Sequence, residues 1–557
     1  MRFLSTVVVS VATASLFAMP LACSSSSDSS ATPDAGSPEG SVPVDAGPQM
    51  DTTVPASTLT LTVTTAPAPL TLGKSVHLIV HVGRGAADTG NVVVTITGLP
   101  SGVTASPTTI AAGASDGDIA LTASMTAKIG SAMLSINAAA PTGSASATAK
   151  LTVRGLSGTL DTGLAGTGVF FATTATEGLG SIVVQPDGKI IVGGHSTLAA
   201  WVARYDDAMT PDMSFGTTGS TSVDFSTGFR EDLYSLLPDA SGRIVAVGTS
   251  NTTGVTALAI AARFTAAGAL DPTYGTAGKT TMAYVAGNGA AAPRSLMQAD
   301  GKVTLLGNVT NGLGQWAFAR LTSDGAVDAS FGTSGVTAVP TAQISGAPAC
   351  GGFQSDGKLV AGGVDFGVGG PIVPIWRVER LLALGALDDG FGTSGGFSVP
   401  QSAVSGIAGC AVNPVTNTFV AAGVILEDPH YDFALERFTS AGVVDPTFNG
   451  GAVSKIIISD SDGTAQLGVT DVFLTTDGKI VAVGSAPSGF FTIARWNADG
   501  TPDTTFGTAG VFSSSGPVTS QGQIIATAYD AAQNRILFAG TGVVGGSTGI
   551  FVSRVWL

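Results

Sequence analysis

A turn of the form Asp-x-x-aromatic-Gly recurs along most of this chain, and its period restricts the possible folds more than any other feature. Consecutive copies begin 51 to 60 residues apart. A fixed period of this size indicates a repeat architecture, in which each unit buries its apolar surface against its neighbours. Five clear copies occupy residues 212–216, 271–275, 328–332, 388–392 and 503–507, and two degenerate copies occupy 161–165 and 445–449.

A second marker runs in step with the first: a hairpin turn followed by an apolar strand. Asp-Gly, Ser-Gly or Asn supplies the positive φ that tight hairpins require. Each unit offers four short runs of strand-forming residues that are apolar throughout instead of alternating, so we expect both strand faces to be covered. Seven whole periods with no polar end repeat favour a closed ring over an open solenoid. The turns lie at 187–189, 241–243, 300–302, 356–358 and 477–479, and at Asn417 and Asn534.

The third marker is one arginine per unit. In the first six units an aspartate of the next turn follows this arginine after eight residues. Because buried charges must be paired, the constant interval predicts a repeated structural ion pair or an Asp-capped turn that locks each unit to the next. The seventh arginine is Arg554. The six predicted pairs are Arg204 with Asp212, Arg263 with Asp271, Arg320 with Asp328, Arg380 with Asp388, Arg437 with Asp445, and Arg495 with Asp503.

Together these markers resemble the delta-60 repeat of bacterial surface proteins, a unit thought to build β-propellers. The resemblance covers about residues 161–557 and implies an all-β fold, with a seven-bladed β-propeller over residues 155–557. Leu164, Ala165 and Asn449 depart from the turn pattern, and Asn417 and Asn534 lack the Asp-Gly pair. An outer-membrane barrel is disfavoured, because its strands should alternate over about ten residues.

Residues 57–154 carry a different pattern of short alternating runs, which predicts a β-sandwich that precedes the ring. Gly98-Leu-Pro-Ser-Gly-Val103 resembles a turn of bacterial immunoglobulin-like domains, which implies an immunoglobulin-like β-sandwich. His77 and His81 share one strand face because their separation is even. With no third ligand nearby, we expect an exposed face instead of a metal site.

The N-terminal residues indicate export. Residues 1–22 combine Arg2, an apolar run and a small-residue cleavage site, which is typical of a signal peptide. Cys23 directly after Leu-Ala resembles a bacterial lipobox, although Pro20 departs from the usual Leu, and implies lipidation at Cys23. Residues 23–56 are rich in Ser, Pro and acidic side chains, which predicts a disordered tether. We therefore expect a protein anchored by lipid to the outer membrane of the bacterial cell envelope.

Cys350 and Cys410 are the two cysteines besides Cys23. They lie at equivalent positions of neighbouring units, where other units carry Ser181 and Ser235. Equivalent side chains should point the same way round a ring instead of toward each other, and a disulfide needs Cβ atoms about 4 Å apart. We therefore expect two buried free thiols.

The net charge of −15 disfavours nucleic acid as a partner. No catalytic, cofactor-binding or metal-binding set stands out. The four histidines are scattered, and Asp460-Ser-Asp-Gly463 lacks the closing glutamate of a calcium loop. The leading hypothesis is a noncatalytic, monomeric surface propeller that binds an extracellular glycan or envelope protein. One alternative is a propeller enzyme acting on polysaccharide or cell-wall material with loop acids such as Asp365, Glu427 or Asp428; another is a purely structural surface protein.

Overall fold

The structure is a computed structural model. It describes residues 59–86, 88–173, 178–196, 199–225, 230–250, 257–284, 289–310, 315–339, 347–365, 375–393, 395–399, 406–427, 430–459, 468–485, 491–514, 520–544 and 547–557. The predicted signal peptide, the tether and Cys23 lie outside these ranges, as do Asp428 and residues 460–463.

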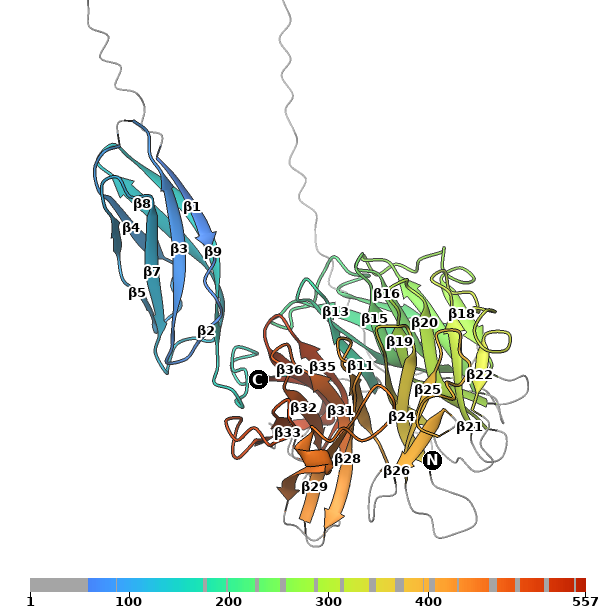
Figure 1. Ribbon diagram of the computed structural model, residues 1–557. Helices are drawn as coiled ribbons and strands as arrows, with labels where there is room; N and C mark the ends of the chain where they lie inside the picture. The colour runs from blue at the N-terminus through green and yellow to red at the C-terminus, as the bar shows by residue number, and fades with distance from the viewer. Residues whose placement is uncertain are drawn as a thin grey trace, which may run out of the picture. The chain divides into compact units, whose positions relative to one another are not determined.

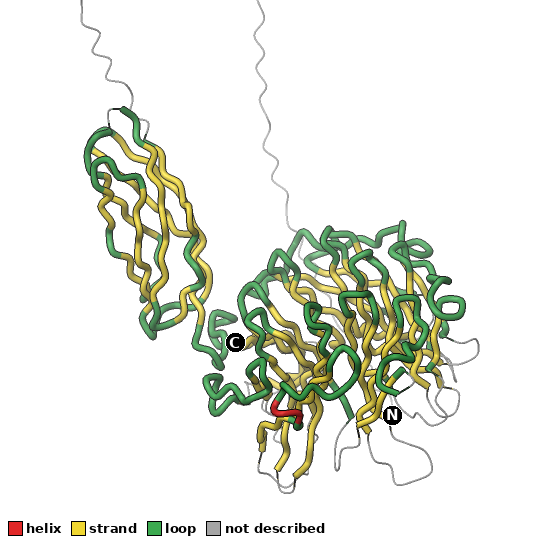
Figure 2. The backbone as a smooth tube through the Cα atoms, in the orientation of Figure 1, coloured by secondary structure: helices red, strands yellow, loops and turns green. Residues whose placement is uncertain are grey.

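Over the described ranges the chain is built from β-strands, with one short 3-10 turn, η1 (Asn449–Gly451) (Figure 2). The predicted all-β class is therefore confirmed. No described helix has the length and apolarity needed to span a membrane.

Residues 59–154 form two sheets that enclose one hydrophobic core. Their strands alternate: in β3, Leu78, Val80 and Val82 are buried, whereas His77 and His81 on the other face are exposed. The first sheet has the order β1-β3-β7-β5 and the second β2-β9-β8-β4-β6. The strands are β1 (Thr60–Thr65), β2 (Leu70–Thr71), β3 (Ser75–Gly83), β4 (Val92–Thr97), β5 (Val103–Ala105), β6 (Thr108–Ile110), β7 (Asp116–Ala123), β8 (Gly130–Ala140) and β9 (Gly143–Arg154).

The described residues from 155 onward form seven antiparallel four-stranded sheets. Six of them consist of four consecutive strands: β11 (Gly178–Val184), β12 (Ile190–His195), β13 (Ala200–Tyr205) and β14 (Ser220–Val223); β15 (Glu231–Pro238), β16 (Ile244–Ser250), β17 (Leu258–Phe264) and β18 (Lys279–Met282); β19 (Gly289–Met297), β20 (Val303–Thr310), β21 (Gln315–Leu321) and β22 (Val336–Ala338); β23 (Pro348–Phe353), β24 (Leu359–Asp365), β25 (Ile375–Leu381) and β26 (Gly396–Val399); β27 (Gly409–Val412), β28 (Phe419–Glu427), β29 (His430–Phe438) and β30 (Ser454–Ser459); β31 (Gly468–Leu474), β32 (Ile480–Ser485), β33 (Phe491–Trp496) and β34 (Val511–Ser514).

The first strands of these sheets contact one another in succession, from β11 through β15, β19, β23, β27 and β31 to β35, and β35 contacts β11. The cycle of contacts makes the seven sheets a closed ring, and residues of all seven inner strands line a central channel. Figure 1 shows the ring from one side. Apolar residues on both faces of the middle strands are buried between neighbouring sheets, as in β16, where all seven residues are buried.

The last sheet closes the ring with a strand from the other end of the repeat series. It has the order β10-β37-β36-β35, with β10 (Val169–Thr173), β35 (Ser520–Asp530), β36 (Arg535–Val544) and β37 (Ser547–Trp556). β10 pairs with β37 from Val169 opposite Ser553 to Thr173 opposite Gly549. We call the junction between this sheet and the sheet β11–β14 the seam.

The irregular turns keep the backbone conformation of the regular ones. Ala165 and Asn449 have φ of 50° and 48°, close to the 57° of Gly216 at the equivalent position. Asn417 and Asn534 have φ of 57° and 54° at the hairpin positions where Gly301 has 81°. Asparagine tolerates the left-handed region because its side chain can hydrogen-bond locally. The departures in sequence thus change the turns without breaking the repeat.

Candidate functional site

The structure brings each of the six repeat arginines onto the aspartate eight residues later. The shortest N–O distances are 2.7 to 2.8 Å. The unit of Arg320 shows what the pair does: Nε donates to Asp328, Nη1 donates to the backbone oxygen of Ala383 in the next unit at 2.5 Å, and the guanidinium lies 4.6 Å above the ring of Phe331. The arginine therefore ties its own turn to the following one.

The aspartate of each pair also accepts several hydrogen bonds. Asp328 also accepts from the backbone N–H and the hydroxyl of Ser330, and Lys302 lies 3.5 Å away. Burial opposes ionisation of Asp328, but the bonds from Ser330 and Arg320 outweigh it and lower the pKa to about 2. These charges are committed to the scaffold.

At the seam, Asp161 occupies the place of the aspartate that would follow Arg554. Arg554 and Arg535 each contact the Asp161 carboxylate at 2.9 Å, and the Asp161 N–H donates to the Arg554 oxygen. Asp212 makes the same backbone bond to Arg204 in the first sheet. The N-terminal turn thus completes the seventh unit, and the ion-pair series is circular.

A set of seven residues on the inner strands, each eight residues ahead of a hairpin-turn position that matches Lys189, borders the central channel. We call it the girdle; it consists of Ser181, Ser235, Arg294, Cys350, Cys410, Asp471 and Thr527, all of which line one cavity of about 200 Å³. In five of the described inner strands a register shift ends at the girdle residue, at Ser181, Ser235, Arg294, Cys350 and Asp471. Such bulges re-aim side chains.

The prediction of two free thiols is wrong, because Cys350 and Cys410 form a disulfide with Cα atoms 5.6 Å apart. The strand pairing explains the contact: Cys350 lies opposite Gly362, whereas Cys410 lies one residue out of that register, opposite Ala421, because the hairpin after β27 is one residue longer than the hairpin after β23. Successive residues of a strand face opposite sides of the sheet, so Cys410 turns back toward Cys350. The bond joins β23 to β27 in adjacent sheets.

Arg294 crosses the channel between sheets that are not neighbours. Its guanidinium donates to the backbone oxygens of Ala349 and Thr470, both at 3.1 Å, and lies 3.7 Å from the Asp471 carboxylate. Burial raises the pKa of Asp471, and Arg294 opposes that rise. Arg294 and the disulfide therefore tie four of the seven inner strands together at the axis.

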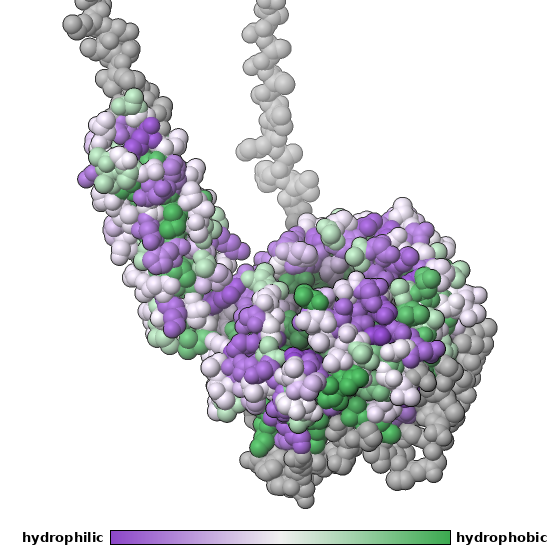
Figure 3. All heavy atoms as spheres, in the orientation of Figure 1, coloured by the Kyte–Doolittle hydropathy of each residue, from purple (hydrophilic) through white to green (hydrophobic). Residues whose placement is uncertain are grey.

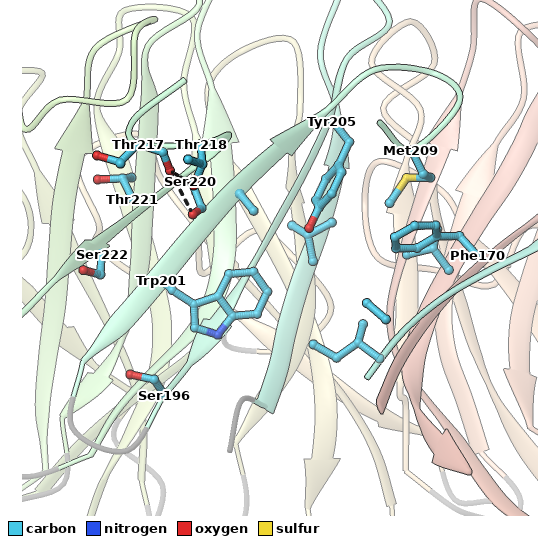
Figure 4. Close-up of a pocket in the computed structure, with 15 residues that line it drawn as sticks. Phe170, Ser196, Trp201, Tyr205, Met209, Thr217, Thr218, Ser220, Thr221 and Ser222 are labelled. Atoms are coloured by element: carbon cyan, nitrogen blue, oxygen red, sulfur yellow. Dashed lines mark hydrogen bonds between the residues drawn. The ribbon is translucent and has the colours of Figure 1, made fainter. Parts of the chain in front are cut away.

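A cavity with a volume of about 620 Å³ lies at the seam. Figure 4 shows Ser and Thr side chains on one side, Phe170 and Met209 on the other, and Trp201 and Tyr205 between them. The last sheet provides Phe170, Ala172, Ile550 and Val552; the sheet β11–β14 and its turns provide Val192, Ser196, Trp201, Ala203, Tyr205, Met209, Thr217, Thr218, Ser220, Thr221 and Ser222.

The seam is open because both of its walls depart from the repeat. The six residues equivalent to Tyr205 are buried to 0–1% exposure, whereas Tyr205 is half-buried. On the opposite wall, Ala172 replaces larger residues such as Val223 and Ile456, and Leu164 replaces the turn aromatic. The six equivalents of Tyr205 are Phe264, Leu321, Leu381, Phe438, Trp496 and Val555.

Trp201 is held in a fixed orientation at this cavity. Its indole N–H donates to the backbone oxygen of His195 at 3.1 Å, which leaves the ring face to the cavity. The Phe170 and Tyr205 rings are 6.0 Å apart and inclined at 58°. Fixed aromatic faces beside hydroxyl groups can bind a ligand that is apolar on one side and polar on the other. The repeat markers of a single unit do not reveal this site. It is marked instead by residues on both walls of the seam that depart from the repeat.

Two adjacent acids near the seam, Asp206 and Asp207, are scaffold groups. Asp206 accepts backbone N–H bonds from Ala208 and Thr210, and Asp207 contacts Arg554 at 2.9 Å. Asp365 ends β24. The side chains of Glu427 and Asp428 lie outside the described part of the structure.

Three of the four histidines have aspartate partners that sequence spacing did not reveal. His77 and His81 contact Asp118 and Asp116, each at 2.8 Å, on the exposed face of the first sandwich sheet. His195 contacts Asp232 of the neighbouring sheet at 2.7 Å. Burial lowers the pKa of His195, and Asp232 opposes the shift. No group of three or more metal-ligating side chains occurs among the described residues.

Four segments of the ring match one family model, described as "Domain of unknown function (DUF5122) beta-propeller". These four segments are similar to the repeats of that β-propeller family. The matches cover residues 185–215, 240–274, 298–331 and 475–506, each running from a hairpin turn to the aromatic turn. They are the delta-60-like repeats that the markers indicated.

No curated protein matches the chain. Solved structures that resemble it include surface layer protein SbsC, domains 4–9 (12% identity, 89% of this chain and 82% of that chain, TM-score 0.14) and an ICAM-5 D1–D4 ectodomain fragment (9% identity, 90% and 99%, TM-score 0.15). With TM-scores this low, neither bears on the fold.

Proposed function

We propose that this chain is a noncatalytic β-propeller lipoprotein, tethered to the cell surface, that binds an extracellular glycan. In this proposal the seven sheets are the blades of a seven-bladed propeller, residues 57–154 are an immunoglobulin-like domain, and lipid on Cys23 holds the protein in the outer membrane. The family matches support the propeller repeats. The disulfide between Cys350 and Cys410 supports an oxidising compartment outside the cytoplasm.

The seam cavity carries the proposal of binding. Its volume of about 620 Å³ lies within the range of small-molecule sites, roughly 300–1,000 Å³. A protein partner would instead need a surface of about 800 Å² per side. A concave site with aromatic and hydroxyl groups favours a glycan over an envelope protein.

The test uses the full-length chain, purified in mild detergent and mixed with insoluble polysaccharides and envelope fractions. Co-sedimentation shows binding, and mass spectrometry of the supernatant detects released fragments. Retention of the protein with intact glycan is the expected result. Absence of retention on every glycan would overturn the proposal, and would favour the structural role or a protein partner.

One observation favours the enzyme alternative: the His195–Asp232 pair. A carboxylate that orients an imidazole is part of many general-base sites, and the lowered pKa of His195 favours its neutral, basic form. If fragments are released in the same assay, His195→Ala is the first variant to test. Loss of fragments with unchanged thermal unfolding would establish catalysis at this pair.

A further inference from the structure

We propose that the seam cavity holds one uncharged sugar ring of the glycan, stacked on Trp201 and bridging the first and last sheets of the ring. The inference rests on the proposed function and adds the site, the charge class of the ligand and a link between binding and ring closure.

The lining of the cavity determines the charge class. None of the fifteen described lining residues is acidic, basic or a histidine. A uronate or amino sugar would lose hydration there without gaining an ionic partner, and an unpaired buried charge is strongly unfavourable. An uncharged sugar meets no such penalty, although the chain as a whole carries a net charge of −15.

The two kinds of lining group match the two sides of a pyranose ring. Trp201 presents a flat face, because its N–H is already bonded to His195, and the tilted Phe170–Tyr205 pair forms an apolar corner beside it. Sugar C–H faces pack on such rings. The hydroxyl-bearing residues of the turn before β14 lie opposite and can exchange hydrogen bonds with sugar hydroxyls (Figure 4).

Both walls of this cavity carry residues that differ from those at several equivalent positions of the ring. Trp201 stands where the following two units carry Ile260 and Ala317, and both of these are fully buried. Ala172 opposes it where two other sheets carry Val223 and Ile456. A small residue on one wall and a half-buried tryptophan on the other create space that the regular junctions fill.

Ligand binding and closure of the seam are therefore coupled. β10 completes the last sheet by pairing with β37, and the cavity touches β10 through Phe170 and Ala172 and touches β13 through Trp201 and Tyr205. A ligand that contacts both walls binds only the closed seam, and by mass action it favours closure.

The first experiment measures affinity by titration calorimetry on the full-length chain. The probes are malto-, cello-, manno-, galacto- and N-acetylchito-oligosaccharides, with oligogalacturonate as the charged probe. We expect an uncharged oligosaccharide to bind, Trp201→Ala to weaken it about tenfold or more, and Ala172→Ile to abolish it while keeping the thermal unfolding midpoint. Ala172→Ile restores the size found in regular sheets. Its matched control, Ser514→Ile at the equivalent position of β34, should bind normally.

The second experiment measures amide hydrogen exchange with and without the bound oligosaccharide. Protection should increase in 169–173 and 200–222 and stay unchanged in the equivalent segments 315–338. Binding that survives both Trp201→Ala and Ala172→Ile would overturn the site while leaving the glycan function in place. Binding of oligogalacturonate alone would overturn the charge class. Failure of every probe would overturn the proposed function together with this inference.

Discussion

Met209 adopts a left-handed backbone conformation, with φ of 61°, and shares one buried cluster with Leu164 across the seam. Five other units carry glycine at the position of Met209, and a Cβ there would meet the aromatic ring of the preceding turn; at Gly268 it would lie 3.0 Å from Phe215. The preceding turn of the Met209 unit has Leu164 in place of the aromatic. A larger residue on one side of the junction thus accompanies a smaller one on the other.

This pairing predicts non-additive substitutions. Leu164→Phe alone should overpack the junction and cost about 1–3 kcal/mol. Met209→Gly alone should leave a void and lower the free energy of unfolding by a similar amount. Glycine relieves the strain of the left-handed backbone, which offsets part of the lost packing. The double variant, which recreates the regular pair, should recover most of the loss in urea unfolding. Strictly additive losses would show that the two side chains do not compensate each other.

The disulfide should contribute substantially to stability. Its cysteines are 60 residues apart, and closing a loop of that length in the unfolded chain corresponds to about 4 kcal/mol at 25 °C. Replacing Cys350 and Cys410 with serine, the residue of two other girdle positions, should lower the unfolding midpoint in urea. Reductant should lower the unfolding midpoint of the parent chain by the same amount, and it should leave the midpoint of the serine variant unchanged. An unchanged midpoint in both would contradict the prediction.

Glu436 should make stability depend on pH. Its side chain is buried in β29, Oε2 has no hydrogen-bond partner among the described residues, and burial raises the pKa from 4.5 to about 7. Folding therefore favours the protonated form, so this contribution is fully present below about pH 4.5 and is lost as pH rises to about 7. The loss amounts to at most about 3 kcal/mol.

Glu436→Gln should remove that pH dependence and be more stable than the parent chain at pH 8. Glu379 is the equivalent residue one unit earlier, and it accepts a bond from Arg377 at 2.6 Å. Glu379→Gln weakens this contact and should lower the free energy of unfolding at pH 8. It is therefore the control variant, with an effect opposite to that of Glu436→Gln. Parallel stability curves for the parent chain and Glu436→Gln between pH 5 and 8 would refute the assignment.

Closure by β10 predicts a sharp difference between two truncations. A chain of residues 155–557 keeps Asp161 and β10, and should fold as a monomer. A chain of residues 178–557 lacks both, which leaves the β37 edge unpaired and Arg535 and Arg554 without Asp161. It should unfold at lower temperature and associate through that edge. Size-exclusion chromatography and thermal unfolding compare the two, and equal behaviour would argue against closure by β10.

Much of the architecture was predictable because it repeats. The interval of eight residues between Arg320 and Asp328 is a local relationship, since the strand and the turn that hold them are adjacent in sequence. The Asp-Gly turns and apolar strands are local in the same way. Asparagine at 417 and 534 preserved those turns, which explains why the degenerate units follow the same pattern.

The features at the axis and the seam were not predictable in that way. Cys350 and Cys410 meet because the longer hairpin after β27 shifts Cys410 by one residue in register and turns it toward the neighbouring sheet. The seam cavity depends on Ala172, Trp201 and Tyr205, which only ring closure brings together with Ile550.

The sequence by itself determined the all-β class and the repeated units, because their turns and strands depend on contacts between near neighbours in the chain. Tertiary structure decided the disulfide, the arginine across the channel and the cavity at the seam. Those contacts join residues that are distant in sequence, and the geometry of closure sets which of them meet.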